Sequence, residues 1–301
     1  MHIRLVTSFT LVAFATNSLL CRLALGGNLI DPLSFTAFRL VSGAMALALL
    51  SCTVPEEDSP KKVNGAWASG LALFIYAIAF SLAYVSLSTG SGALLLFGSV
   101  QITMMAAALK SGEKPGGAQW FGSALAIGGL IYLVLPGLSA PNPVGALLMC
   151  VAGIAWGVYS IRGKSVSAPA TMTAKNFLRS GPMAIVVSAA GRSSVHLVPT
   201  GILLALLSGG ITSGLGYVLW YKALRGLTTT QAAVAQLLVP VLAAFGGVAL
   251  LSERMSVRLM VSSMLILGGV ALAILKRKPA PRRDSVVHLF AGLPGDRPSD
   301  G

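Results

Sequence analysis

The chain has 301 residues, of which 55% are hydrophobic and only 10% charged, and its mean hydropathy is +0.80. Soluble globular proteins carry roughly 25% charged residues, so this composition excludes a water-covered surface over most of the protein. Disorder of the bulk and a disulfide scaffold are excluded as well, because aliphatic residues are abundant and the three cysteines are scattered. A polytopic helical membrane protein remains.

Ten apolar stretches are long enough to cross a bilayer, because a helix needs about 20 apolar residues to span the hydrocarbon. Turn-forming segments separate them, such as Gly-Gly-Asn at 26–28 and Pro-Asn-Pro at 141–143. The seventh stretch is the least apolar, since it contains Lys175, Arg179 and Pro182. The predicted spans are 5–25, 34–53, 65–87, 91–109, 118–136, 143–161, 171–190, 199–221, 229–250 and 256–275.

The positions of the 22 Lys and Arg residues predict the orientation, because cytoplasmic loops of membrane proteins are rich in these residues. With the N-terminus in the cytoplasm, fifteen lie on the cytoplasmic side, four on the other side and three within spans. Both termini are then cytoplasmic in an inner (plasma) membrane, and 276–301 is a basic, disordered tail. The net charge of +13 is explained by this orientation of the spans. Because the sequence has no basic stripe interleaved with aromatic residues, we do not expect nucleic acid as a partner.

The chain matches itself at an offset of 140 residues, which pairs Arg22 with Arg162 and Glu113 with Glu253. Matched charges carry weight because membrane spans rarely contain charged residues. The sequence therefore predicts two copies of a five-span unit, 1–137 and 138–275. Since five is odd, the second copy is inverted, and inverted repeats are typical of secondary transporters with a site at the repeat interface. The predicted fold is an all-α membrane protein of ten transmembrane helices in two inverted five-helix repeats.

Three pairs of residues occupy matching places in the two copies: Asn17 and Trp156 in the first span, Arg39 and Arg179 in the second, and Gly112-Glu113 and Ser252-Glu253 after the fourth. With the repeat, this pattern resembles the EamA-type, ten-span family of the drug/metabolite transporter superfamily over about 275 residues. Pro240 in the ninth span also fits, whereas the first copy has Val100 there. Within the family the chain is most similar to YddG-type exporters of aromatic amino acids. The resemblance implies outward transport of amino acids, aromatic ones among them.

Aromatic and amide side chains fall at helical spacing inside the predicted spans, as at Tyr76, Phe80 and Tyr84. Such side chains suit a cavity that holds an amphipathic organic solute by stacking and a few hydrogen bonds. Packing or lipid contact is the alternative for the aromatics, and helix–helix hydrogen bonding for the amides. The candidates for the cavity are Asn17, Tyr76, Phe80, Tyr84, Phe97, Gln101, Trp156, Tyr159, Tyr217 and Gln236.

Four further aromatics lie near predicted span ends, where aromatic belts are expected. We assign Trp67 and Trp120 to the belt, whereas Trp220 and Tyr221 fit the belt and the cavity equally well.

Arg39 and Arg179 lie about two turns inside their spans, and Lys175 shares a helix face with Arg179 because the two are four residues apart. One hypothesis is a wet vestibule in which they receive a carboxylate. The alternative is that they determine topology and extend to the membrane surface. For the two glutamates after the fourth span of each copy we favour local salt bridges, which for Glu253 means Arg254 and Arg258.

No Asp, Glu or His lies in the middle of a predicted span, so we expect neither intramembrane catalysis nor a cofactor or metal. The same absence argues against carboxylate-based ion coupling and favours a facilitator or exchanger of small solutes. We expect this transporter to be a monomer. Two alternatives stay open: proton-coupled efflux of drugs or metabolites, and a membrane scaffold or sensor without transport.

Overall fold

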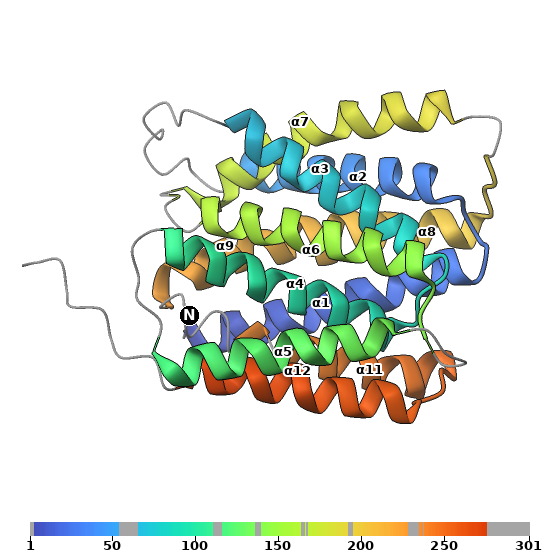
Figure 1. Ribbon diagram of the computed structural model, residues 1–301. Helices are drawn as coiled ribbons and strands as arrows, with labels where there is room; N and C mark the ends of the chain where they lie inside the picture. Colours follow the sequence, from blue (N-terminus) through green and yellow to red (C-terminus); the bar gives the residue numbers. More distant parts are fainter. Residues whose placement is uncertain are drawn as a thin grey trace, which may run out of the picture.

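The computed structural model describes residues 3–53, 66–110, 116–135, 140–163, 166, 168–191, 195–227, 235–236 and 238–275. These residues form helices that lie side by side, with their connections at two ends of the bundle (Figure 1). The elements are α1 (Ile3–Gly26), α2 (Pro32–Thr53), α3 (Ala66–Tyr84), α4 (Thr89–Lys110), α5 (Gly117–Val134), α6 (Pro143–Gly163), α7 (Pro169–Ala190), α8 (Pro199–Leu207), η2 (Ser208–Leu215), α9 (Gly216–Gly226), α11 (Leu238–Leu251) and α12 (Val257–Leu275).

Polar side chains start several of these helices. Asp31 Oδ1 accepts the backbone N–H of Ser34 at 2.9 Å, and Asn142 Oδ1 accepts that of Gly145 at 2.9 Å. Both caps are followed by a proline, whose fixed φ suits the first helical position and whose missing N–H needs no partner there. The polar loops that separated the predicted spans thus act locally as helix starts.

The eighth predicted span is longer than expected and not α-helical throughout. Elements α8, η2 and α9 form one helical run from Pro199 to Gly226, and its middle, Ser208–Leu215, is a π-helix. Wider π-helical turns are rare and often occur at functional sites. Because the run continues to Gly226, the residues near 220 lie inside the helix and not at its end.

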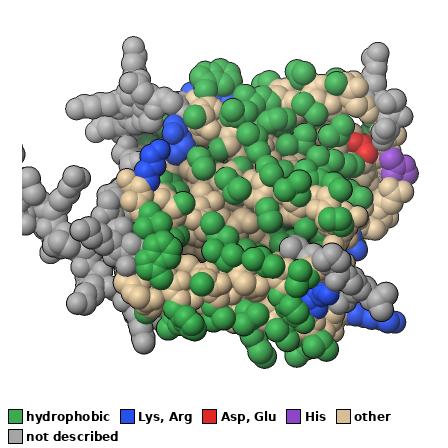
Figure 2. Space-filling model, viewed as in Figure 1, with side chains coloured by type: hydrophobic (Ala, Val, Ile, Leu, Met, Phe, Trp, Pro, Cys, Tyr) green, Lys and Arg blue, Asp and Glu red, His purple; other side chains and the backbone are tan. Residues whose placement is uncertain are grey.

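The apolar side chains fall into a buried core and an exposed belt. Large hydrophobic side chains such as Leu49, Val186, Phe245 and Met264 are exposed. On the face in Figure 2, hydrophobic side chains cover the middle and charged ones lie toward two ends of the bundle. An exposed apolar surface of this extent fits contact with lipid and not with water.

Six helical runs among the described residues are long and apolar enough to cross a membrane: Leu5–Gly26, Pro32–Leu50, Trp67–Tyr84, Thr89–Ala107, Pro143–Gly163 and Pro199–Gly226. Three shorter apolar helices are Trp120–Leu133, Leu238–Leu251 and Val257–Gly269. The seventh predicted span forms α7, which contains Pro182. An all-helical protein with several apolar spans is therefore confirmed, and ten crossings stay a prediction. The predicted tail at 276–301, the start of the ninth predicted span at 229–234, and Glu113 lie outside the described residues.

Candidate solute-binding site

Aromatic rings from four helices meet inside the bundle, around Trp156 of α6. The Trp156 ring centroid lies 5.3 Å from that of Phe14 on α1, 5.0 Å from that of Tyr76 on α3 and 4.7 Å from that of Tyr217 on α9. All four side chains are buried. Edge-on and tilted pairs at this separation attract one another beyond the area that they bury. Helices far apart in the sequence are thus joined by one aromatic cluster.

A small cavity lies beside these rings, between α1, α3, α4 and α6. Five of the predicted cavity residues line it, namely Asn17, Tyr76, Phe80, Phe97 and Trp156. Three residues that were not predicted, Phe14, Ser18 and Leu96, complete the lining. The cavity has a volume of about 10 Å³, which is room for roughly one water molecule. An organic solute therefore fits only if the aromatic walls move apart.

Arg39 of α2 is buried against two walls of this cavity. Its side chain is 1% exposed, and its guanidinium carbon lies 5.2 Å from the ring centroid of Tyr76 and 5.1 Å from that of Phe80. Arginine stacks favourably on such rings. The interpretation that Arg39 extends to the membrane surface is therefore wrong, because packing holds the guanidinium inside the bundle.

Neutral hydroxyls hold the Arg39 guanidinium. Its Nε donates to Ser213 Oγ at 3.0 Å, and its Nη2 donates to Tyr76 Oη at 3.2 Å and to Tyr217 Oη at 2.9 Å. Nη1 has no hydrogen-bond partner among the described residues. Ser213 belongs to the π-helical segment η2, so this segment helps to position the charge.

Close contact between backbones brings η2 to α2. A Cβ atom on Gly209 would lie 2.0 Å from the carbonyl oxygen of Arg39 and 2.0 Å from Ser42 Oγ. No side chain fits there, so glycine is required at 209. The small and hydroxyl-bearing sequence Ser-Gly-Gly-Ile-Thr-Ser-Gly at 208–214 was the available signal for this segment in an otherwise apolar span.

Asn17 both lines the cavity and ties α1 to η2. Its Oδ1 accepts hydrogen bonds from Ser208 Oγ at 2.7 Å and Thr212 Oγ1 at 3.1 Å. The two interpretations of Asn17, cavity lining and helix–helix hydrogen bonding, are thus compatible in one side chain.

Three more predicted residues surround the cavity without being part of its lining. The Trp156 indole Nε1 donates to Gln236 Oε1 at 3.4 Å. Tyr159 stacks on Trp156 with the ring centroids 5.5 Å apart, and Tyr217 touches both Trp156 and Arg39. These residues support the groups that face the cavity.

The remaining predicted residues lie elsewhere. Tyr84 is buried at the far end of α3, where its hydroxyl donates to the Thr89 carbonyl at 3.4 Å, and Gln101 is half-buried further along α4. Lys175 is exposed, and the Arg179 guanidinium carbon lies 5.7 Å from the ring centroid of Trp67.

The three predicted vestibule charges are therefore not together. Trp67 and Tyr76 are nine residues apart on α3, which is about 13 Å at 1.5 Å per residue. Arg179 lies over the first of these rings and Arg39 over the second. Arg39 thus belongs to the central cluster, whereas Arg179 lies near the start of α3.

The aromatics predicted near span ends divide into two pairs. Trp67 and Trp120 are 65% and 58% exposed, as a membrane belt requires. Trp220 and Tyr221 are 0% and 1% exposed, so the belt interpretation is wrong for them. The helical run extends five residues past Tyr221, which places both rings inside the bundle.

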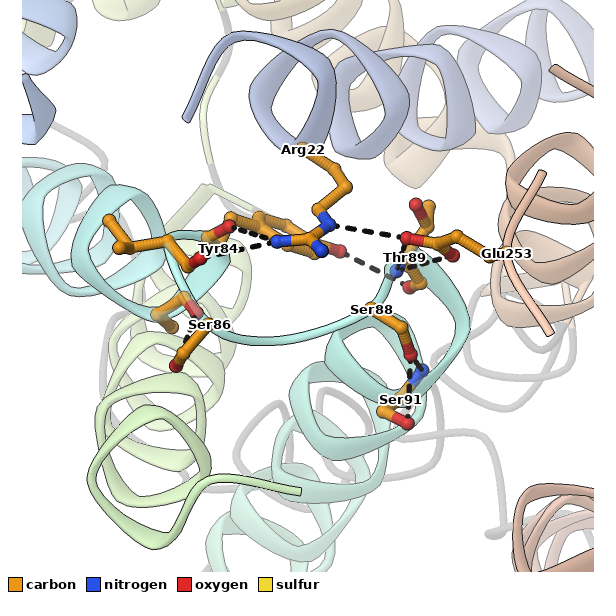
Figure 3. A network of polar contacts seen from close by, with 9 residues as sticks. Arg22, Tyr84, Ser86, Ser88, Thr89, Ser91 and Glu253 are labelled. Carbon is orange, nitrogen blue, oxygen red and sulfur yellow. Dashed lines mark hydrogen bonds and ion pairs between the residues drawn. The ribbon is translucent and has the colours of Figure 1, made fainter. Parts of the chain in front are cut away.

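A separate polar network joins three connections at one end of the bundle (Figure 3). Arg22 Nε forms an ion pair with Glu253 Oε1 at 3.2 Å, and Arg22 Nη1 donates to the carbonyl oxygens of Tyr84 at 3.1 Å and Val85 at 3.2 Å. The Glu253 carboxylate also accepts the Thr89 N–H, with both oxygens at 3.0 and 2.9 Å. Glu253 thus caps α4 where the helix dipole favours a negative charge.

The expected local salt bridge of Glu253 with Arg254 and Arg258 is therefore wrong. Its partner is Arg22, which is 231 residues away in the sequence. Arg258 instead donates to the Leu135 carbonyl and lies over the Tyr132 ring at 5.7 Å. Of the four charges that the predicted repeat matches, Arg22 and Glu253 take part in this network. Arg162 instead donates to Ser69 Oγ at 2.9 Å, and Glu113 lies outside the described residues.

Residues 5–135 and 143–275 each match the sequence model of the EamA-like transporter family. The chain belongs to the EamA-like transporter family. It is 48% identical over 273 residues to an uncharacterized protein of Pseudomonas aeruginosa, covering 91% of this chain and 94% of that protein. An uncharacterized transporter of Bacillus subtilis is 27% identical over 88% of this chain and 90% of its own length.

A probable amino-acid metabolite efflux pump of Escherichia coli is 25% identical over 66% of this chain and 72% of its own length. One crystal structure of another protein superimposes with a TM-score of 0.65 over 90% of this chain and 99% of that chain, at 20% identity, and supports the fold. This EamA-like transporter is accordingly a multi-pass helical membrane protein that acts on small molecules.

Proposed function

We propose that this EamA-like transporter moves small amphipathic solutes, amino acids with apolar or aromatic side chains among them, across the inner membrane by alternating access. The observation that carries the proposal is the cavity between α1, α3, α4 and α6, whose walls are aromatic rings and a few uncharged polar groups. Rings of this kind bind the apolar body of a solute, and the polar groups orient it. The name of the relative in Escherichia coli and the resemblance to YddG-type exporters both support an amino acid as the solute and export as the direction.

The proposed architecture is ten crossings in two inverted repeats, 1–137 and 138–275, followed by a cytoplasmic tail at 276–301. Helix packing supports it when α1 to α5 are matched in order with α6, α7, the run α8–η2–α9, α11 and α12. Under this match, α3 and α4 pack on α6 just as the run and α11 pack on α1. The match also exchanges the two helices within each of three packed pairs, namely α2–α7, α4–α11 and α5–α12. Packing of this symmetry is what a pseudo-two-fold axis through the site would produce.

The proposed cycle needs no ionisable relay. All Asp, Glu and His residues of the sequence lie outside the middle of the predicted spans, and carriers driven by protons usually place such groups in the membrane interior. We therefore propose a monomeric facilitator or exchanger that follows the solute gradient, with both termini in the cytoplasm. Because the cavity admits roughly one water molecule, each cycle must separate the rings of Tyr76, Phe80 and Trp156 to admit a solute.

Uptake of labelled phenylalanine into liposomes that contain the purified full-length protein tests this function. We expect saturable uptake that is unchanged by an imposed proton gradient. Trp156→Ala should reduce uptake at least about tenfold, since loss of one such aromatic contact is worth roughly 1.4 kcal/mol. Trp120→Ala, at an exposed tryptophan of α5, is the matched control and should leave uptake unchanged.

Two outcomes would contradict the proposal. Uptake that depends on the proton gradient would reject the facilitator mechanism in favour of proton-coupled transport. Absence of uptake for every amino acid supplied, with the protein folded in the vesicles, would exclude amino acids as the solute.

A further inference from the structure

We propose that Arg39 binds the carboxylate of the transported solute, which makes apolar carboxylates the substrate class of this protein. This inference rests on the proposed function and names the solute group that the site recognises. Four observations support it: the burial of the guanidinium, the absence of a counter-charge, its unused donors, and the two rings that it shares with the cavity.

Arg39 has no counter-charge among the described residues. The acidic residues that the structure describes are Asp31 and Glu253. Asp31 accepts hydrogen bonds from backbone N–H groups at the start of α2, and Glu253 pairs with Arg22. Charged side chains within membrane proteins pair with one another or mark the pathway of a substrate or ion. An anionic ligand would supply the charge that Arg39 lacks.

The guanidinium of Arg39 also has N–H donors without a hydrogen-bond partner among the described residues. Arginine presents five N–H groups, and the fork of two adjacent nitrogens matches the two oxygens of a carboxylate. Hydroxyls of Ser213, Tyr76 and Tyr217 occupy Nε and Nη2, while Nη1 is buried without a partner among the described residues. A buried donor without a partner costs about 1–3 kcal/mol, so a ligand that accepts from Nη1 gains this energy on binding.

Arg39 and the cavity share two walls. The rings of Tyr76 and Phe80 line the cavity and also lie against the guanidinium, at 5.2 and 5.1 Å from its central carbon. These rings lie between the cavity and the guanidinium of Arg39. A solute whose apolar body moves them apart would therefore lie next to the guanidinium. The Tyr76 hydroxyl, which now accepts from Arg39, would give up this bond to the carboxylate.

The described lining contains no carboxylate that could pair with an ammonium group. Its polar members among the described residues are Asn17, Ser18 and the Tyr76 hydroxyl, all of them neutral. The site is thus built to distinguish solutes by the carboxylate and not by the ammonium group. Phenylalanine and 3-phenylpropanoate, which lacks the ammonium, should therefore bind well, whereas phenethylamine, which lacks the carboxylate, should bind much more weakly.

Isothermal titration of the purified full-length protein with these three compounds tests the inference. We expect phenethylamine to bind at least tenfold more weakly than 3-phenylpropanoate. Arg39→Gln should weaken both carboxylates at least tenfold and leave phenethylamine unchanged. Arg39→Lys, which keeps the charge but not the fork, should be intermediate. Arg258→Gln, the same change at an arginine over the exposed Tyr132 ring, is the matched control and should bind like the unaltered protein.

The unaltered protein alone decides the main question, so the test does not depend on the folding of a variant. Equal binding of phenethylamine and 3-phenylpropanoate, or no binding of either, overturns the inference. Flux is measured separately in liposomes. Phenylalanine flux without a carboxylate preference leaves the proposed transport intact and rejects the role of Arg39. Carboxylate-selective binding without flux supports the role of Arg39 and rejects the proposed transport.

Discussion

Two arginines on consecutive helices are stabilised in opposite ways. Arg22, at the end of α1, forms an ion pair with Glu253 at 3.2 Å and donates to two carbonyl oxygens. Arg39, on α2, is almost completely buried and contacts neutral hydroxyls and aromatic rings. Arg22 is part of a closed network, whereas Arg39 retains unused donors.

The difference indicates which charge is structural and which is available to a ligand. Removing a charge from water costs free energy that a nearby opposite charge and full hydrogen bonding offset. Arg22 has both, and Glu253 in addition caps α4, so the network stabilises one end of the bundle without an external partner. Arg39 has neither in full. The packing of α2 against η2 and α3 keeps Arg39 buried. A bound carboxylate would supply the opposite charge and the hydrogen bonds that Arg39 lacks.

The largest effect is expected where the position of Arg39 is fixed by the backbone. Gly209→Ala places a Cβ about 2.0 Å from the Arg39 carbonyl oxygen, so α2 and η2 must move apart. We expect a loss of about 3 kcal/mol of unfolding free energy and loss of carboxylate binding. Thermal unfolding in detergent and titration with 3-phenylpropanoate measure the two effects.

Gly210→Ala is the matched control, because its new Cβ meets its nearest neighbour at 3.6 Å, an ordinary contact. We expect unchanged or slightly raised stability, since alanine is favoured over glycine in a helix. If the two glycine variants behaved alike, the close contact of η2 with Arg39 would not determine the site.

A smaller effect is expected from opening the closed network. Glu253→Ala removes the partner of Arg22 and the cap of α4 together, which should cost about 2 kcal/mol. Glu253→Gln keeps an oxygen for the Thr89 N–H and should cost about half as much. Unfolding midpoints in detergent give the comparison.

Arg254→Gln tests whether the pairing of Glu253 is local. This arginine follows Glu253 directly in the sequence, yet the ion pair is made by Arg22. We expect no change in the unfolding midpoint. A shift as large as that of Glu253→Gln would mean that the neighbouring charge, and not Arg22, satisfies the carboxylate.

The same substitution at the two arginines should separate stability from binding. Arg22→Gln breaks the ion pair and should lower the unfolding free energy by about 1 kcal/mol, while carboxylate binding persists. Arg39→Gln removes a buried charge without a counter-charge and should leave the unfolding free energy within about 1 kcal/mol, while carboxylate binding is lost. The opposite assignment of the two losses would reverse the roles of Arg22 and Arg39.

Sequence patterns predicted the helices well and the contacts between them poorly. Spans such as α1 and α6 follow from local length and hydropathy, and the polar caps at Asp31 and Asn142 mark their starts. Aromatic and amide residues at helical spacing predicted five of the eight residues that line the cavity. Phe14 was overlooked although it lies three residues before Asn17 and thus on the same face of α1.

Long-range pairing and unusual backbone geometry were not predictable in the same way. A glutamate beside two arginines in the sequence gives no reason to choose a partner 231 residues away, except that the repeat matches both charges. The π-helical turn at Ser208–Leu215 changes the face on which Ser213 lies, and helical periodicity assumes that such turns are absent. The predicted repeat places Arg39 and Arg179 at equivalent positions, although packing gives the two arginines different surroundings.

The smallest effect is expected at a hydroxyl that holds Arg39 in place. Tyr217→Phe keeps the ring against Trp156 but removes the oxygen that accepts from Arg39 Nη2 at 2.9 Å and donates to Tyr76 Oη at 3.2 Å. Loss of such a bond costs about 1 kcal/mol, so we expect a change of less than about fivefold in the affinity for 3-phenylpropanoate by titration. Tyr132→Phe, at an exposed tyrosine of α5, is the control and should change nothing. If Tyr217→Phe abolished binding as completely as Arg39→Gln, the phenol and not the guanidinium would be the group that holds the carboxylate.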